Sequence, residues 1–91
     1  NSRISAVLAG TVLFSGWTLE TGNVIYIQHE NNLTSAYKHN AELLKRTGEA
    51  VKAGEAIAII GNSGELSTGP HLHFELWYNG KPVDPMNYIV F

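Results

Sequence analysis

The chain has 91 residues, of which 44% are hydrophobic, and its six Lys and Arg against eight Asp and Glu give a formal net charge of -2. This length supports one domain, because a second independent core would be too small to be stable. The sequence has no basic stripe that could neutralise phosphates, so nucleic acid is not expected as a partner. It also shows no apolar run long enough to cross a bilayer and no secretory signal pattern, so no membrane span is expected in these residues.

Cysteine is absent from the sequence. This excludes disulfide bonds, thiolate zinc sites and a cysteine nucleophile. Any bound metal must therefore be held by His, Asp or Glu. The histidines are His29, His39, His71 and His73.

Short apolar and β-branched runs, separated by Gly, Asn and Pro, predict a mostly antiparallel all-β domain. In chain order, we expect strands over residues 4–8, 11–14, 24–29, 33–37, 56–60 and 71–78. Asn31-Asn32 and Asn79-Gly80 predict tight hairpin turns, because Asn and Gly tolerate positive φ angles. The expected fold has two stacked sheets, one of which forms the floor of an open groove.

Two segments predict something other than a plain strand. Residues 41–46 are strong helix formers without β-branching and are followed by Gly48, which predicts one or two helical turns. Residues 48–61 place two glycine turns around Val51, ahead of an apolar strand. This arrangement resembles the hammerhead turn of lipoyl-like and biotinyl-like domains, although no matching motif for a modified lysine is present.

The segment His71-Leu72-His73 is the main candidate for chemistry. In a strand, residues two apart point to the same face about 7 Å apart. Two such imidazoles can converge on one volume, where one binds a metal and the other bonds a metal-bound water. The alternative is a solvent-facing polar strand that happens to carry two histidines, but the preceding Gly69-Pro70 turn restricts how the strand begins and favours a site. By the same spacing, Tyr37 and His39 are predicted to form a second same-face pair and to add a third imidazole.

Residues 68–75, Thr-Gly-Pro-His-Leu-His-Phe-Glu, follow Tyr37-x-His39 and the segments 51–55 and 59–64 in a recognisable order. Together with the ending over residues 80–88, they resemble the lysostaphin-type (LytM-like) peptidoglycan endopeptidases, a family of zinc metallopeptidases. The resemblance extends over residues 7–88. It implies that His73 is a zinc ligand and that His39 and His71 are catalytic groups acting on the zinc-bound water and the developing oxyanion. A neutral imidazole suits this role because it can accept and return a proton near neutral pH.

The family completes its zinc site with an upstream His and, a few residues later, an Asp. This sequence contains neither before its first expected strand, and its first Asp is Asp84. Three protein ligands cannot be assembled from His73 alone. Either the chain starts downstream of the first motif, or the domain has lost metal binding and acts as a scaffold or activator of cell-wall hydrolases. We favour the first interpretation, because the three other functional histidine positions are all occupied.

The resemblance implies one peptidase-like domain over residues 1–91. It also implies that this domain is the C-terminal part of a larger protein and contacts upstream domains. The implied activity is Zn²⁺-dependent hydrolysis of peptide bonds in peptidoglycan, in the periplasm or cell envelope. His29 is predicted to be a hydrogen-bonded structural residue at a strand end. The aromatic residues that could line a groove are predicted to pack in the core or at its rim instead. They are Trp17, Tyr26, Trp77 and Tyr78.

Overall fold

The structure, a computed structural model, describes residues 3–61 and 73–84 and contains only strands and turns over these ranges. All strand pairs are antiparallel, which confirms the predicted all-β antiparallel class. The strands are β1 (Arg3–Ser5), β2 (Gly10–Thr18), β3 (Gly22–Gln28), β4 (Leu33–Leu43), β5 (Ala50–Val51), β6 (Ala56–Ile60), β7 (His73–Tyr78) and β8 (Lys81–Val83). This part of the chain contains no helix that could span a membrane.

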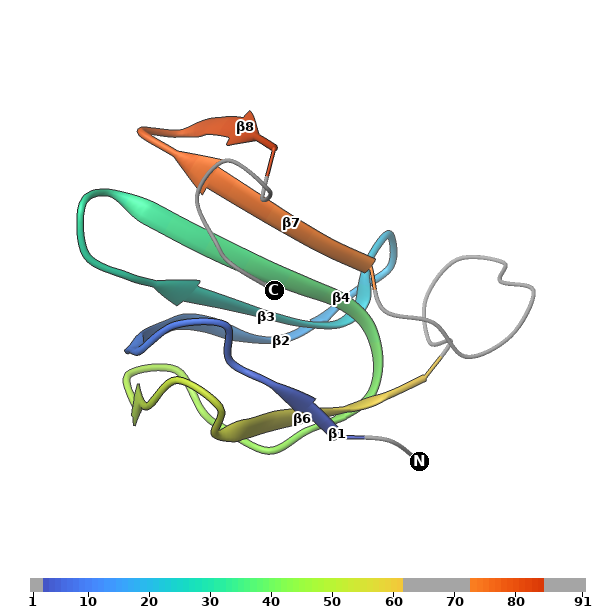
Figure 1. The fold of residues 1–91 in the computed structure, drawn as a ribbon. Coiled ribbons are helices and arrows are strands. Elements are labelled where there is room, and N and C mark those ends of the chain that lie inside the picture. The colour runs from blue at the N-terminus through green and yellow to red at the C-terminus, as the bar shows by residue number, and fades with distance from the viewer. Residues whose placement is uncertain (1–2, 62–72, 85–91) are drawn as a thin grey trace.

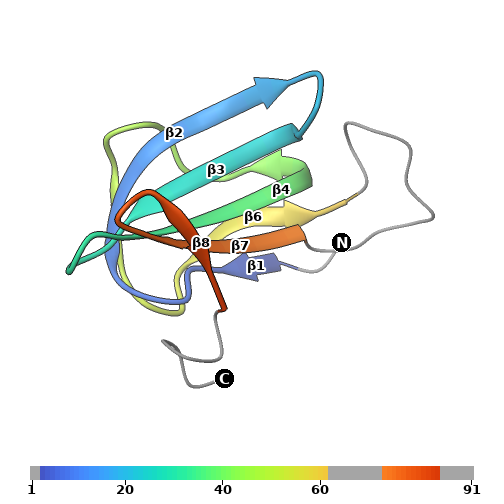
Figure 2. The same ribbon diagram turned by 90° about the horizontal axis from the view of Figure 1, so that it is seen from above.

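The eight strands form one hydrogen-bonded sheet rather than two separate ones. Its main order is β1-β6-β4-β3-β2-β5, and β7 joins it beside β4 with β8 at its own outer edge. Strand β4 is the branch point: one edge pairs with β3, while the other pairs first with β7 and then with β6. Figure 1 shows β4 bending between these two parts, so that β6 and β1 lie below the other strands. Figure 2 shows the same sheet from above, with the strands fanned across it.

The core lies inside this curled sheet. Ile25 and Ile27 of β3 are fully buried there, while Tyr26 between them points to the outer face. Tyr37 of β4 packs on Phe74 of β7, with ring centroids 5.3 Å apart. Strand alternation therefore gives the sheet an apolar inner face and a mixed outer face. The buried core cluster consists of Ile4, Ala6, Val12, Ile25, Ile27, Tyr37, Val51, Ile57 and Ala58.

Both predicted asparagine turns are confirmed. Asn31 and Asn32, between β3 and β4, have φ angles of 59° and 61°. Asn79 and Gly80, between β7 and β8, have φ angles of 51° and 79°. Two consecutive positive φ angles are the requirement of a tight type I′ hairpin turn, which Asn and Gly meet at little cost. The first turn determines where β4 begins, and the second determines where β7 ends.

The predicted helical turn over residues 41–46 is wrong, because β4 continues through Leu43. Glu42 and Leu43 are register partners of Ile59 and Ala58 in β6. The Leu44 N–H then donates to the Ile57 carbonyl at 2.9 Å. A helix of six residues is not stable without tertiary packing. Pairing with β6 supplies the backbone hydrogen bonds instead.

Glycine turns do occur on both sides of Val51, as predicted. Gly48 and Gly54 have φ angles of 93° and 84°. The comparison of this segment with lipoyl-like hammerheads stays a prediction.

Candidate functional site

His39 lies where β4 exchanges one neighbour for the other. The β7 pairing of β4 ends at Lys38, and its β6 pairing begins at Asn40. The register with β3 also shifts here, so that Lys38 and His39 together lie opposite the single residue Val24. An extra residue of this kind bends a strand and re-aims its side chains. The branch of the sheet and the bulge in β4 therefore coincide at His39.

The backbone of His39 has a conformation that is uncommon for a residue with a side chain. Its φ angle is 61°, and its N–H donates to the Thr21 carbonyl in the β2–β3 turn at 2.8 Å. The left-handed region costs a non-glycine residue about 1–2 kcal/mol. Such strain is found preferentially at functional positions.

The predicted same-face pairing of Tyr37 and His39 is wrong in its reasoning, because it assumed a regular strand. Tyr37 is only 1% exposed and lies in the core. His39 is half-buried and follows the extra residue that interrupts the alternation. Spacing of two therefore does not place these side chains on one face.

The structure brings the backbones of two predicted site residues together. His73 is the first residue of β7 and the register partner of Lys38, which is the chain neighbour of His39. His39 and His73 are thus offset by one residue on adjacent strands. His71 lies outside the described residues, as does the side chain of His73, so their predicted roles stay predictions.

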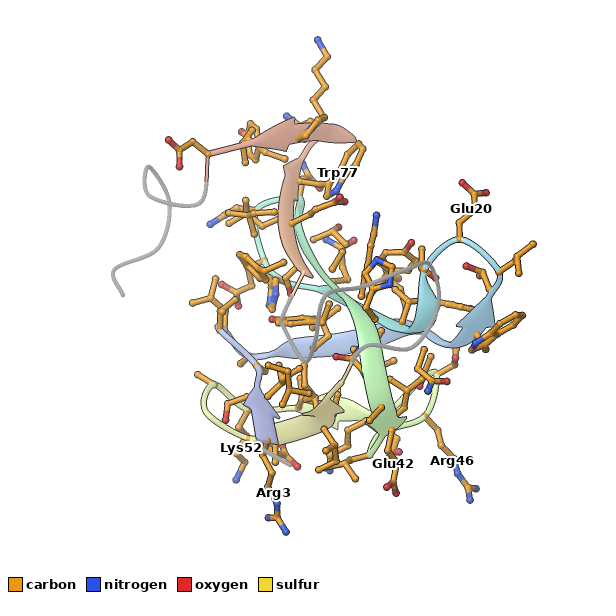
Figure 3. All side chains as sticks on the ribbon, turned by 90° about the vertical axis from the view of Figure 1, so that its right-hand side faces the viewer. Arg3, Glu20, Glu42, Arg46, Lys52 and Trp77 are labelled. Carbon is orange, nitrogen blue, oxygen red and sulfur yellow. The ribbon has the colours of Figure 1, made fainter. Side chains whose placement is uncertain are left out.

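A hollow of about 360 Å³ lies beside this pair of strands, on the outer face of the sheet. Lys38 lines it at the end nearest the histidines, and Trp77 lines it further along β7. Figure 3 shows Trp77 projecting from β7 near the β7–β8 turn. The complete lining consists of Leu13, Tyr26, Thr34, Lys38, Glu75, Trp77 and Gly80.

Glu75 connects two of the lining residues. Its Oε2 lies 3.1 Å from Lys38 Nζ in an ion pair, and its Oε1 accepts a hydrogen bond from Trp77 Nε1 at 3.1 Å. The sequence pattern, with Glu75 and Trp77 two residues apart in a strand, places both side chains on one face, and both line the outer-face hollow. It missed Lys38, because only the register between β4 and β7 brings that ammonium to Glu75.

The described residues do not by themselves fit a zinc ion. Within residues 3–61 and 73–84, no three His, Cys, Asp or Glu residues are grouped closely enough to hold a metal. A zinc site needs three protein ligands. The nearby carboxylate of Glu75 is already engaged by Lys38 and Trp77. The described residues therefore offer no complete zinc ligand set.

His29 has the structural role that was predicted for it. It is 6% exposed, its Nδ1–H donates to the Ala9 carbonyl at 2.8 Å, and its Nε2 is hydrogen-bonded to Ser35 Oγ at 2.7 Å. Ser35 Oγ is also hydrogen-bonded to the Tyr37 hydroxyl at 2.8 Å, and that hydroxyl accepts the Val7 N–H at 3.2 Å. Burial lowers the pKa of His29, against a smaller raising effect of the Ala9 carbonyl. This network, which we call the His29 network, ties β4 to the segment between β1 and β2.

The aromatic residues divide between the hollow and the surface. Tyr26 and Trp77 line the hollow, in contrast to the predicted preference for core or rim packing. Trp17 and Tyr78 are 57% and 38% exposed. The all-β fold therefore presents an outer-face hollow with aromatic walls, beside two neighbouring histidine positions on β4 and β7.

In this sheet, His39 within β4 and His73 at the start of β7 occupy neighbouring positions beside the outer-face hollow. Residues 1–85 match the model of Peptidase family M23. The chain belongs to this family, which confirms the resemblance to lysostaphin-type peptidases.

Individual relatives agree with this assignment. The murein hydrolase activator NlpD of Escherichia coli is 44% identical over 87 residues, which cover 94% of this chain and 22% of that protein. A zinc-containing peptidase of Vibrio cholerae has a similar structure, with a TM-score of 0.85 and 35% identity over 92% of this chain and 26% of that one. The catalytic domain of lysostaphin from Staphylococcus simulans also gives a TM-score of 0.85, with 30% identity over 96% of this chain and 69% of that one. The chain thus spans about a fifth of the length of its NlpD relative.

Proposed function

We propose that this domain hydrolyses peptide bonds in bacterial peptidoglycan. The observation that carries the proposal is the pairing of β4 with β7, which sets His39 and His73 side by side at the end of an outer-face hollow. Membership of Peptidase family M23 and likeness to the lysostaphin catalytic domain support it. The hollow suits an extended peptide laid along β4 and β7.

His39 and His71 are the proposed catalytic groups. An imidazole can accept a proton from an attacking nucleophile and return one to the leaving amine near neutral pH. The bulge at His39 would hold that ring at the branch of the sheet rather than in the core. Its strained backbone supports a functional role over a purely structural one.

His73 is the proposed metal ligand, and Zn²⁺ the proposed metal. Because the described residues supply no complete ligand set, the remaining ligands must come from residues outside them. We also propose that this domain contacts other parts of a longer protein. An extracytoplasmic location in the cell envelope is also proposed, supported by relatives named as the lipoprotein NlpD of Yersinia enterocolitica and outer membrane antigenic lipoprotein B of Haemophilus influenzae.

The second candidate function is activation of a separate murein hydrolase without catalysis. Two observations favour it: a 44% identical relative is named a murein hydrolase activator, and residues 3–61 and 73–84 contain no group of three metal-binding side chains. In this case the outer-face hollow would hold a peptide or a partner without cleaving it.

The test compares histidine variants of the full-length protein in release of peptides from purified peptidoglycan. His39→Ala and His71→Ala should lower hydrolysis by about a hundredfold or more while zinc stays bound, as expected for loss of a proton-transfer group. His73→Ala should lose both zinc and hydrolysis. Glu42→Gln is the matched control, because Glu42 is exposed on the same strand as His39 (Figure 3) and should leave both readouts unchanged.

Wild-type hydrolysis in His39→Ala and His73→Ala would rule out the proposed catalytic site. No hydrolysis by the wild type, together with faster turnover when the protein is added to a separate murein hydrolase, would establish the activator function instead. Loss of zinc in His71→Ala would show that the roles of His71 and His73 have been exchanged.

A further inference from the structure

Glu75 holds two side chains of the outer-face hollow in place. One carboxylate oxygen is paired with Lys38 and the other accepts from Trp77, both at 3.1 Å. Lys38 lies opposite His73 in the register, so its ion pair with Glu75 is a diagonal contact across β4 and β7. A long lysine side chain normally samples many rotamers. Here the contact with Glu75 restrains its ammonium at the end of the hollow nearest the histidines.

The Lys38 ammonium has donor capacity beyond this ion pair. An ammonium carries three N–H groups, and the bond to Glu75 engages one. The Lys38 side chain is only 19% exposed, so its charge is partly shielded from water. A charged donor in such a place gains more from an anionic acceptor than from a neutral one.

Apart from Glu75 and Thr34, the remainder of the lining is mainly apolar. Leu13 of β2, Tyr26 of β3 and Trp77 of β7 form its walls. Its volume of about 360 Å³ is that of a small ligand site and accommodates a residue or two of a peptide. A complementary ligand therefore has an aliphatic part that packs on the walls and a negative charge at the Lys38 end.

The position of Lys38 relates this charge to the proposed chemistry. It is the chain neighbour of His39 and the register partner of His73. A peptide residue bound in the hollow would therefore lie next to the bond that these histidines are proposed to cleave. Resting on the proposed function, we propose that the hollow is a specificity subsite for a carboxylate-bearing residue of an extended wall peptide, with Lys38 as the contact and Glu75 as its positioning residue.

The experiment measures peptide binding without hydrolysis. The probe is a short synthetic stem peptide with a free side carboxylate, compared with the same peptide in which that carboxylate is amidated. The protein is the full-length His39→Ala variant in which Trp17, and any Trp outside residues 1–91, is replaced by Phe, so that Trp77 alone reports on the hollow by its fluorescence. The acid peptide should bind about tenfold more tightly than the amide, as expected for a charged hydrogen bond.

Lys38→Met should remove this preference, whereas Lys38→Arg should retain part of it because it keeps the charge. Glu75→Gln should weaken the preference, since the ammonium loses its ionic tether. Lys52→Met is the control: Lys52 is exposed at the opposite end of the molecule from Trp77 (Figure 3), and its removal should leave the preference intact.

Equal binding of the two peptides, binding of neither, or an unchanged preference in Lys38→Met would each overturn the subsite. The outcome is separable from that of the hydrolysis test. A selective peptide-binding protein that cleaves nothing would refute the proposed peptidase and keep the subsite. An active peptidase without acid preference would do the reverse.

Discussion

The His29 network offers the sharpest test of how β4 is held. Ser35 is fully buried and its hydroxyl contacts both His29 Nε2 at 2.7 Å and the Tyr37 hydroxyl at 2.8 Å. Ser35→Ala removes one oxygen and leaves two buried polar groups without this partner. Each such group costs about 1–3 kcal/mol. Because the Tyr37 hydroxyl keeps its hydrogen bond to the Val7 N–H, we expect a loss in the lower part of the summed range, about 2–4 kcal/mol in the free energy of unfolding.

This loss is large compared with the stability of a small domain, which is about 5–15 kcal/mol. For a chain of this size it corresponds to a fall of about 10–20 °C in the melting temperature. The assay is urea and thermal unfolding followed by circular dichroism. The matched control is Thr34→Val, on the neighbouring residue, because the Thr34 hydroxyl makes a longer bond of 3.3 Å to Gln28 Oε1 and is not fully buried.

The control variant should lose less than about 1 kcal/mol of unfolding free energy, as expected for one partly exposed hydrogen bond. A Ser35→Ala protein within about 0.5 kcal/mol of the wild type would refute the reasoning, because it would mean that the buried groups find other partners. A similar loss in both variants would mean that the effect is not specific to the His29 network.

Two further predictions concern His29 and the bulge. Since burial lowers the pKa of His29 below its ordinary value of 6.5, the unfolded chain takes up a proton at a higher pH than the folded protein does. The stabilisation that neutral His29 gives the folded protein is therefore fully present above the pKa that His29 has in the unfolded chain. It is lost as pH falls through the lower pKa that His29 has in the folded protein. Unfolding titrations should show this loss in the wild type and a smaller one in His29→Gln; identical pH profiles would contradict it. At His39, with its φ angle of 61°, His39→Gly should be more stable than His39→Ala by about 1 kcal/mol, because only glycine adopts this conformation without strain. Equal unfolding free energies of these two variants would show that the strained backbone relaxes.

The sequence by itself determined the fold class and the protein family. Short β-branched runs with period two predict strands in any context, and Asn31-Asn32 and Asn79-Gly80 specify turns through their own tolerance of positive φ angles. These signals are local, since they depend on a few neighbouring residues. The order of the histidine motifs likewise indicated the family, which residues 1–85 match.

Only the tertiary structure decided which strands pair with which. The features that the sequence did not predict correctly all depend on this pairing. Residues 41–43 form a strand rather than a helix because β6 supplies their hydrogen-bond partners. His39 departs from alternation because β4 changes neighbour there, from β7 to β6. Lys38 joins Glu75 only through the β4–β7 register. Pairing between residues far apart in sequence has no local signature, because its energy comes from contacts that exist only after the chain has folded.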